Sequence, residues 1–215
     1  MYTALFLLLF LFGSAKASTV SPDQLASQYQ LTTSTSFPFP SATAATSDTQ
    51  NLLVSSWSLS KGRIQNQPGD LEFVEVPFPA TQNSSTDVAL QVTYPAGSFS
   101  HDTGGAQFEN LWNTSDGSIF QSMMISYEVA FDQDFDWVKG GKLPGLRGGP
   151  NITGCSGGNE PNGTDCFSTR LMWRPNGAGE GMHTNLITHP LTLRPSLCIY
   201  SYSQWSMSAE EYNLQ

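Results

Sequence analysis

Apolar and polar residues alternate along three short stretches of the chain, VALQVTY (88–94), SMMISYEVAF (122–131) and CFSTRLMWR (166–174). An alternation with period two, in short runs separated by Gly, Pro, Asn and Asp, is typical of antiparallel strands. Helical periodicity is almost absent. The pattern predicts an all-β fold, an antiparallel β-sandwich or β-jelly roll. The apolar faces are Val88, Leu90, Val92 and Tyr94; Met123, Ile125, Tyr127, Val129 and Phe131; and Phe167, Thr169, Leu171 and Trp173.

Two regions on either side of this pattern differ from it in composition and in hydrophobic periodicity. Residues 18–50 are rich in Ser, Thr, Ala, Gln and Pro, so we expect a flexible low-complexity lead-in, with a short helix over Asp23–Tyr29 as a weaker interpretation. Residues 182–215 contain no glycine and little alternation. We therefore expect the sandwich to occupy residues 51–181, to be incomplete at its C-terminal side, and to be followed by an anomalous tail.

The N-terminal residues form a separate segment. The apolar run Ala4–Phe12 is shorter than the roughly 20 residues that a membrane-spanning helix needs. Ala15-Lys16-Ala17 has the small-x-small pattern of a cleavage site. We predict a signal peptide over residues 1–17 and a secreted, extracellular protein that has no membrane anchor after cleavage.

In a secreted protein, Asn-x-Ser/Thr sequons are acceptors for glycosylation, and the four in this chain predict a glycosylated surface. They are Asn83, Asn113, Asn151 and Asn162. Secretion also permits disulfides. Cys155 and Cys166 flank a short loop rich in Gly, Asn and Pro and are the expected pair, which leaves Cys198 over. No His lies at ligand spacing from the pair, so no metal site is predicted.

The charge distribution narrows the class of partner. The 215-residue chain has a formal net charge of −9, which argues against nucleic acid as a partner. Of its nine Lys and Arg, Lys16 lies in the signal peptide, which leaves eight in the mature chain, and five of these fall between residues 139 and 174. The only acids within that region are Glu160 and Asp165. The five cations are Lys139, Lys142, Arg147, Arg170 and Arg174.

The strand expected over 166–174 provides a surface for these cations. Its pleat projects Ser168, Arg170, Met172 and Arg174 away from the apolar face. Arginine binds carboxylates in a bidentate manner, so this face could hold an anionic ligand. A solvated outer face is the alternative. Together with the basic segment KGGKLPGLRGG (139–149), the anion site becomes the favoured interpretation, with Lys139, Arg147 and Arg174 as substrate-binding residues.

Other candidate residues carry weaker signals. The acids of DQDFD (132–136) lack the Gly and the closing Glu of a calcium loop and fit a solvent face. His101 could act as a base but is more often incidental. Trp57, Trp112, Trp137 and Trp173 could stack on sugars, and we expect most of them in the core. We predict no metal and no other cofactor.

Four motifs occur in order along the chain: YPAGSFS (94–100), DFDWVKGGKLPGLRGG (134–149), CSGG (155–158) and CFSTRLMWR (166–174). Over roughly residues 52–181 the sequence resembles polysaccharide lyase family 14 and its fungal relatives. The resemblance implies a β-jelly roll and β-elimination on a uronic-acid polymer such as alginate or polyglucuronate. It also implies Lys142, Ser168 and Arg170 as catalytic residues, with Lys142 either the base or the group that neutralises the substrate carboxylate.

The family also carries a Tyr-x-Tyr pair about a dozen residues beyond the arginine, and this chain has GAGEGMHTNLITHP (177–190) there. Tyr200 and Tyr202 have the wrong spacing, so their role is not carried over. We therefore expect the chain to be altered or truncated after residue 181. The hypotheses are a secreted, monomeric polysaccharide lyase, a non-catalytic carbohydrate-binding jelly roll, and a structural secreted glycoprotein. A lyase would release an unsaturated product, whereas a binding module would only bind the polymer.

Overall fold

The computed structural model covers the chain in segments. It describes residues 20–76, 88–99, 103–118, 120, 122–132, 134–137, 140–151, 154–155, 162–184, 195–201 and 209–214, of which 182–184, 195–201 and 209–214 are described for the backbone alone. The predicted signal peptide and the sequon at Asn83 lie outside these segments, as do His101 and Lys139.

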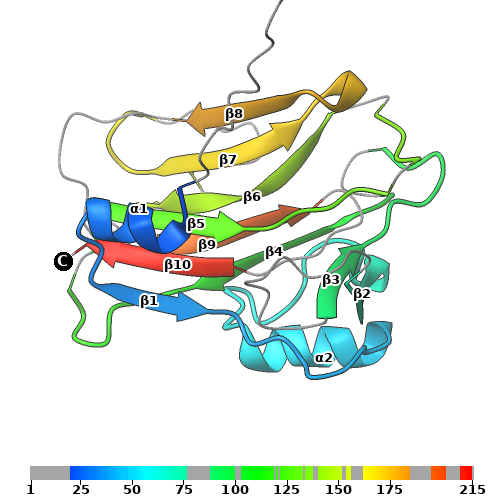
Figure 1. Ribbon diagram of the computed structural model, residues 1–215, viewed down its shortest axis with the longest axis horizontal. Helices are drawn as coiled ribbons and strands as arrows, with labels where there is room; N and C mark the ends of the chain where they lie inside the picture. Colours follow the sequence, from blue (N-terminus) through cyan, green and yellow to red (C-terminus); the bar gives the residue numbers. More distant parts are fainter. Residues whose placement is uncertain are drawn as a thin grey trace, which may run out of the picture.

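Strands dominate the structure, and the strands of each sheet pair in an antiparallel manner (Figure 1). The prediction of an all-β antiparallel fold is confirmed. The helices are α1 (Pro22–Gln28) and α2 (Thr46–Ser56), with two short 3-10 turns, η1 (Pro68–Asp70) and η2 (Pro175–Gly177). The strands are β1 (Thr33–Ser36), β2 (Leu71–Glu75), β3 (Val88–Val92), β4 (Ala106–Leu111), β5 (Ser122–Tyr127), β6 (Gly141–Gly148), β7 (Phe167–Trp173), β8 (Gly179–Thr184), β9 (Pro195–Ser201) and β10 (Ala209–Leu214).

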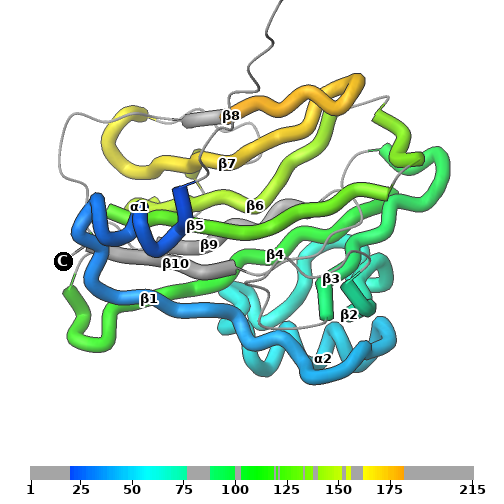
Figure 2. Tube along the Cα trace, viewed as in Figure 1, coloured from blue at the N-terminus to red at the C-terminus, as the bar shows by residue number. Residues whose placement is uncertain are grey.

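The strands form three sheets. The largest has five strands in the order β4-β9-β6-β7-β8, a second has the order β1-β10-β5, and β2 pairs with β3. Figure 2 follows the chain from β6 through β7 to β8, which are consecutive and adjacent in the five-stranded sheet. β6, which lies in the basic segment, is therefore adjacent to β7, the strand predicted to bind an anion.

The core lies where the sheets and α2 meet. Trp57 at the end of α2 is 1% exposed, and its ring centroid lies 5.9 Å from that of Phe108 in β4 and 6.3 Å from that of Phe73 in β2. Met123 and Ile125 of β5 pack against the same cluster, as does Leu146 of β6. Burial of this apolar area is the main stabilising contribution to the fold.

The N-terminal region is more ordered than its composition predicted. Within 18–50, the capping box formed by Ser21 and Gln24 starts α1. β1 pairs with β10, and Phe37 packs on Trp57 with 5.0 Å between ring centroids. Over these residues the structure has a helix and a strand in place of the predicted flexible lead-in, because Phe37 and Phe39 pack against the core without producing a sequence period.

The C-terminal region is also part of the sheets. β9 lies between β4 and β6, and β10 lies between β1 and β5. The boundary predicted at residue 181 is therefore wrong for the backbone, since the five-stranded sheet takes its second strand from beyond it. The prediction failed because β9 and β10 take their places through pairing with distant strands, which local alternation does not reveal.

The three predicted strands are present with shifted ends. β3 and β7 match the alternating stretches closely, whereas β5 ends at Tyr127, and Val129 beyond it is 38% exposed. Leu171, which we expected on a packed face, is 51% exposed. On the same face of β7, Trp173 is 6% exposed and Phe167 packs against the core cluster, so the face is packed at both ends and exposed at Leu171.

Candidate functional site

The pairing of β6 with β7 contains a β-bulge. Lys142 lies opposite Met172 and Gly145 lies opposite Arg170, so β6 has two residues where β7 has one. A regular strand would send Lys142 and Arg147, five positions apart, to opposite faces. Directly opposed residues of an antiparallel pair share a face. The extra residue therefore puts Lys142 on the same face as Arg147, whose partner is Ser168.

The face so formed carries the predicted catalytic residues. Ser168, Arg170 and Met172 alternate along β7 and so lie on one face. Lys142 joins them from β6 as the neighbour of Met172 and the diagonal neighbour of Arg170. Lys142 and Arg170 are both half-buried. Two cations on adjacent strands of one sheet can bind the two oxygens of a carboxylate.

Close packing fixes the start of β6. A Cβ atom on Gly141 would lie 1.9 Å from the Trp173 ring. Phe131 and Phe135 pack on that ring, with centroid separations of 5.8 and 6.0 Å. The glycine before Lys142 is therefore required by the aromatic packing beneath it.

Ser168 is buried next to the disulfide. Cys155 and Cys166 are bonded, with 5.8 Å between their Cα atoms. The Ser168 hydroxyl donates to the Cys155 carbonyl at 3.0 Å, and the residue is 4% exposed. Contact with a substrate would require the Cys155 segment to move, so a catalytic role for Ser168 stays a prediction.

Arg147 does not have the environment of a substrate-binding residue. Its Nη1 lies 2.8 Å from Oε1 of Glu109 in β4, and its Nη2 donates to the Gly154 carbonyl at 2.6 Å. The residue is 4% exposed. A buried guanidinium held by a carboxylate and a carbonyl ties β4, β6 and the disulfide loop together. The structure therefore does not support the prediction that Arg147 binds substrate.

Arg174 directly follows β7 and, by alternation, continues the same face. Its Nε donates to Oε2 of Glu180 in β8, and both side chains are well exposed. The hydrogen bond from Arg174 lowers the pKa of Glu180, and the same bond raises the pKa of Arg174. An anionic ligand at Arg174 would compete with Glu180 for the guanidinium.

Three residues that shape this site have no direct signal in the sequence. Glu109 and Glu180 lie outside the basic region but provide its carboxylate partners. Tyr127 belongs to a predicted apolar face, yet its hydroxyl donates to the Pro144 carbonyl at 3.2 Å. Glu109 lies in AQFENL (106–111), where three of six residues are polar, so the sequence pattern does not reveal its buried ion pair with Arg147.

The remaining predicted sites have mixed surroundings. Asn113 and Asn162 are exposed, whereas Asn151 is half-buried and its Nδ2 donates to Asp165 at 2.9 Å. Trp57 and Trp173 are core residues, as expected. The backbone of Tyr200 pairs with Gln107, and Tyr202 lies outside the described residues.

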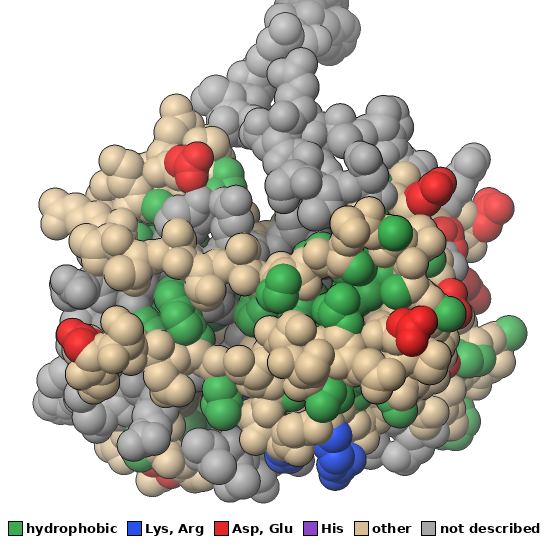
Figure 3. Space-filling view, turned by 90° about the horizontal axis from the view of Figure 1, so that it is seen from below, with side chains coloured by type: hydrophobic (Ala, Val, Ile, Leu, Met, Phe, Trp, Pro, Cys, Tyr) green, Lys and Arg blue, Asp and Glu red, His purple; other side chains and the backbone are tan. Residues whose placement is uncertain are grey.

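The described residues contain no group of three or more His, Cys, Asp or Glu placed to hold a metal ion. Within the same segments, no helix has both the length and the apolar character needed to cross a membrane. On the side of the molecule that carries β1 and α2, Asp and Glu lie mainly near the margin, and Lys and Arg appear near one edge only (Figure 3). The described cations are therefore not spread over that side.

Comparison with known proteins adds a family. The family model for polysaccharide lyase 14 matches residues 81–211. One similar structure is the crystal structure of the marine PL-14 alginate lyase from Aplysia kurodai, with 33% sequence identity and a TM-score of 0.43. The alignment covers 67% of this chain and 59% of the Aplysia kurodai chain. The alginate lyase Aly36B is 13% identical over 85% of this chain and 95% of its own, with a TM-score of 0.49.

A search of curated protein sequences found no match. The chain spans 59% of the length of the Aplysia kurodai enzyme. The family match begins before β3 and continues into β10, so it includes the bulge, the β7 strand and the C-terminal strands. Because the matched residues make up more than half of the sequence, the chain belongs to polysaccharide lyase family 14.

Proposed function

We propose that the protein is a secreted polysaccharide lyase that cleaves a uronic-acid polymer by β-elimination. The observation that carries the proposal is the placement of Lys142 and Arg170 on adjacent strands and one face, in a member of a lyase family. A uronate unit carries a carboxylate next to the carbon that must lose a proton. Two neighbouring cations fit that chemistry.

The reaction needs charge neutralisation and proton transfer. When cations neutralise the carboxylate at C5, the C5 proton becomes more acidic, because the negative charge that develops in the transition state is stabilised. A base removes this proton, and the electron pair forms the C4=C5 double bond. The bond from C4 to the glycosidic oxygen breaks, and the leaving oxygen takes up a proton.

Lys142 can take either of two parts in this scheme. A neutral lysine amine, favoured by the nearby positive charge of Arg170, could remove the C5 proton. A charged lysine would neutralise the carboxylate together with Arg170. The variant Lys142→Arg separates the two, since arginine keeps the charge but does not act as a base at neutral pH. Retained activity in this variant would assign neutralisation to Lys142.

The same charges and the names of the similar structures support a proposed substrate class. The two solved structures are named as alginate lyases. We propose alginate or polyglucuronate as the polymer, since both present a carboxylate on each sugar. The predicted signal peptide and the disulfide support an extracellular site of action.

The experiment measures the ultraviolet absorbance of the unsaturated product after incubation with each polymer. We expect absorbance to rise with at least one of them, and Lys142→Ala to reduce the rate by about 100-fold or more, the lower range for a lost proton-transfer group or electrostatic stabiliser. Lys61→Ala is the control, because Lys61 is exposed and donates to Gln65 at 2.8 Å.

A non-catalytic carbohydrate-binding protein is the second candidate. The observation that favours it is the stretch GAGEGMHTNLITHP (177–190), which has no tyrosine where the family carries its Tyr-x-Tyr pair, so that one group expected to transfer protons has no counterpart there. Binding of a uronate polymer by folded protein, with no absorbance change, would replace the lyase with this function. Neither binding nor turnover would reject both.

A further inference from the structure

The bulge that orients Lys142 is contacted from the opposite sheet. It contains Leu143 and Pro144, between the paired residues Lys142 and Gly145. The pairing of β6 with β9 runs from Gly145 to Gly148, so Pro144 precedes it. Tyr127 of β5, in the sheet β1-β10-β5, donates its hydroxyl to the Pro144 carbonyl at 3.2 Å. A proline has no N–H to add to a ladder, which makes its carbonyl the hydrogen-bonding group of that residue.

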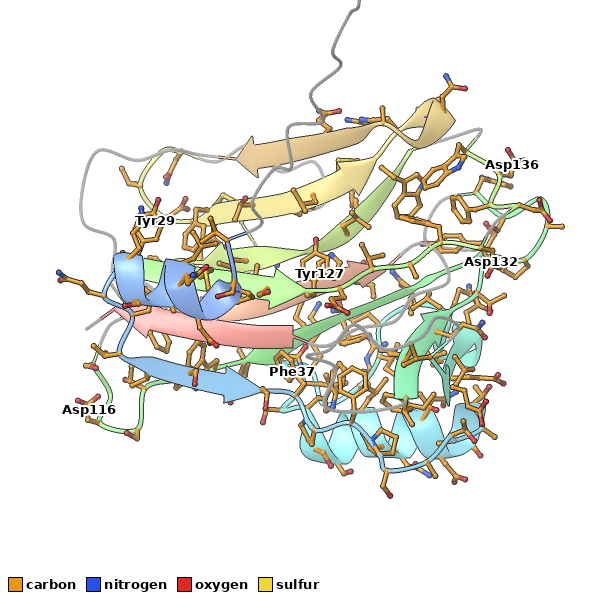
Figure 4. All side chains as sticks on the ribbon, in the orientation of Figure 1. Tyr29, Phe37, Asp116, Tyr127, Asp132 and Asp136 are labelled. Carbon is orange, nitrogen blue, oxygen red and sulfur yellow. A yellow bond between two sulfur atoms is a disulfide. The ribbon has the colours of Figure 1, made fainter. Side chains whose placement is uncertain are left out.

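Tyr127 approaches the bulge from the core side. It follows Met123 and Ile125 at two-residue intervals along β5, and both of these pack against the core cluster. Figure 4 shows Tyr127 among the central strands, whereas Tyr29 directly follows α1 at the edge. Lys142 and Arg170 lie on the opposite face of the five-stranded sheet. Tyr127 therefore contacts β6 from the core side and is not on the face that carries these two cations.

The hydroxyl is a constant donor over the pH range in which proteins are normally assayed. Burial raises the pKa of Tyr127 above its ordinary value, so the group stays protonated and neutral there. The contact with Pro144 therefore does not switch with pH under assay conditions. It is a constant hydrogen bond between the sheet that contains β5 and the sheet that contains β6.

We propose that Tyr127 is a positioning residue of the lyase site, whose hydrogen bond to the Pro144 carbonyl fixes the bulge that places Lys142 on the face of Arg170. The inference rests on the proposed function of Lys142. A shift of one residue in strand register moves each side chain to the opposite face. Loss of the bulge would therefore separate Lys142 from Arg170 while both residues remained in their strands.

The test deletes one oxygen atom. Tyr127→Phe keeps the ring and its packing and removes the donor to Pro144. We expect kcat on the uronate polymer to fall roughly five- to tenfold, the range for one lost hydrogen bond, with KM changed by less than about twofold. Tyr29→Phe is the matched control: the same atom is removed from a residue that is 58% exposed, and activity should not change.

A second measurement follows the bulge without relying on turnover. Amide hydrogen exchange should become about five- to tenfold faster at Leu143 and Gly145 in Tyr127→Phe, and stay unchanged there in Tyr29→Phe. An equal increase across the whole chain would indicate general destabilisation and overturn the inference. Unchanged kcat in Tyr127→Phe would overturn it as well, whether or not exchange at the bulge is faster.

The two proposals fail in different ways. Wild-type protein that is folded but turns over no uronate polymer rejects the lyase function, and with it the part of the inference that concerns catalysis. The exchange experiment then still decides whether Tyr127 holds the bulge. An active wild type with an unaffected Tyr127→Phe variant rejects the inference and leaves the lyase function standing.

Discussion

At the scale of single residues, the site is defined by how its cations are paired. Arg147 is buried with Glu109, and Arg174 shares an exposed hydrogen bond with Glu180. A buried pair is costly to break, because one partner is left charged in an apolar environment. An exposed pair contributes little and can be exchanged for a ligand. Arg174 is therefore available to an anionic polymer in a way that Arg147 is not.

We predict that Glu180→Gln strengthens binding of a uronate oligosaccharide by up to about fivefold, because Arg174 loses its competing carboxylate. The difference should narrow as pH falls through the lowered pKa of Glu180, since the wild-type carboxylate then becomes neutral too. Isothermal titration calorimetry at two pH values measures both effects. Asp48→Asn, at the exposed first turn of α2, is the control for net charge. Equal affinity in Glu180→Gln and wild type would show that Arg174 does not bind substrate.

At the scale of elements, the glycines of β6 allow its close approach to β7. A Cβ atom on Gly145 would lie 1.9 Å from the Thr169 carbonyl oxygen and 2.6 Å from the Arg170 Cα atom. These are backbone atoms, which cannot move aside as the end of a flexible side chain can. The glycine pattern of KGGKLPGLRGG (139–149) is thus a packing requirement of the sheet, on which the placement of Lys142 depends.

We predict that Gly145→Ala lowers the free energy of unfolding by about 1–3 kcal/mol, the usual cost of overpacking. Gly179→Ala is the matched control in the same sheet, since a Cβ atom there meets nothing within 4 Å. The midpoints of urea unfolding compare the two variants. If both variants unfold at the same urea concentration as wild type, the close approach of β6 to β7 at Gly145 does not limit side-chain size there.

At the scale of the whole molecule, distant parts of the chain complete one sheet. β9 connects β4 with β6, so the strand that carries Lys142 is joined to the N-terminal half through residues near the C-terminus. The disulfide adds a second link beside the site, because the carbonyls of Gly154 and Cys155 accept from Arg147 and Ser168. Its reduction should therefore loosen more than its own loop.

We predict that a reductant lowers the stability of the wild-type protein by about 2–4 kcal/mol, as expected for a disulfide that closes a short loop. The cysteines are 11 residues apart in sequence. The double variant Cys155→Ser/Cys166→Ser should start at the lower stability and not respond to the reductant. Thermal melts of both proteins, with and without reductant, make the comparison. A response of equal size in the double variant would assign the effect to Cys198.

The sequence by itself determined the strand class, the family and the identity of the basic segment. The alternation in 88–94 and 166–174 was sufficient, because packing against a core selects every second residue locally. The expectations of a flexible lead-in over 18–50 and of an anomalous tail after 181 do not match the described backbone, because β1, β9 and β10 depend on partners far away in the chain.

Only the tertiary structure decided which cations share the site. The bulge at Leu143 and Pro144 adds one residue to β6 and so brings Lys142 to the face of Arg170, a step that a count along a regular strand gets wrong. Burial with Glu109 removed Arg147 from the candidates, and Tyr127 entered through a contact between sheets. Composition and period report which residues a strand carries, whereas register, bulges and cross-sheet contacts decide which of them meet.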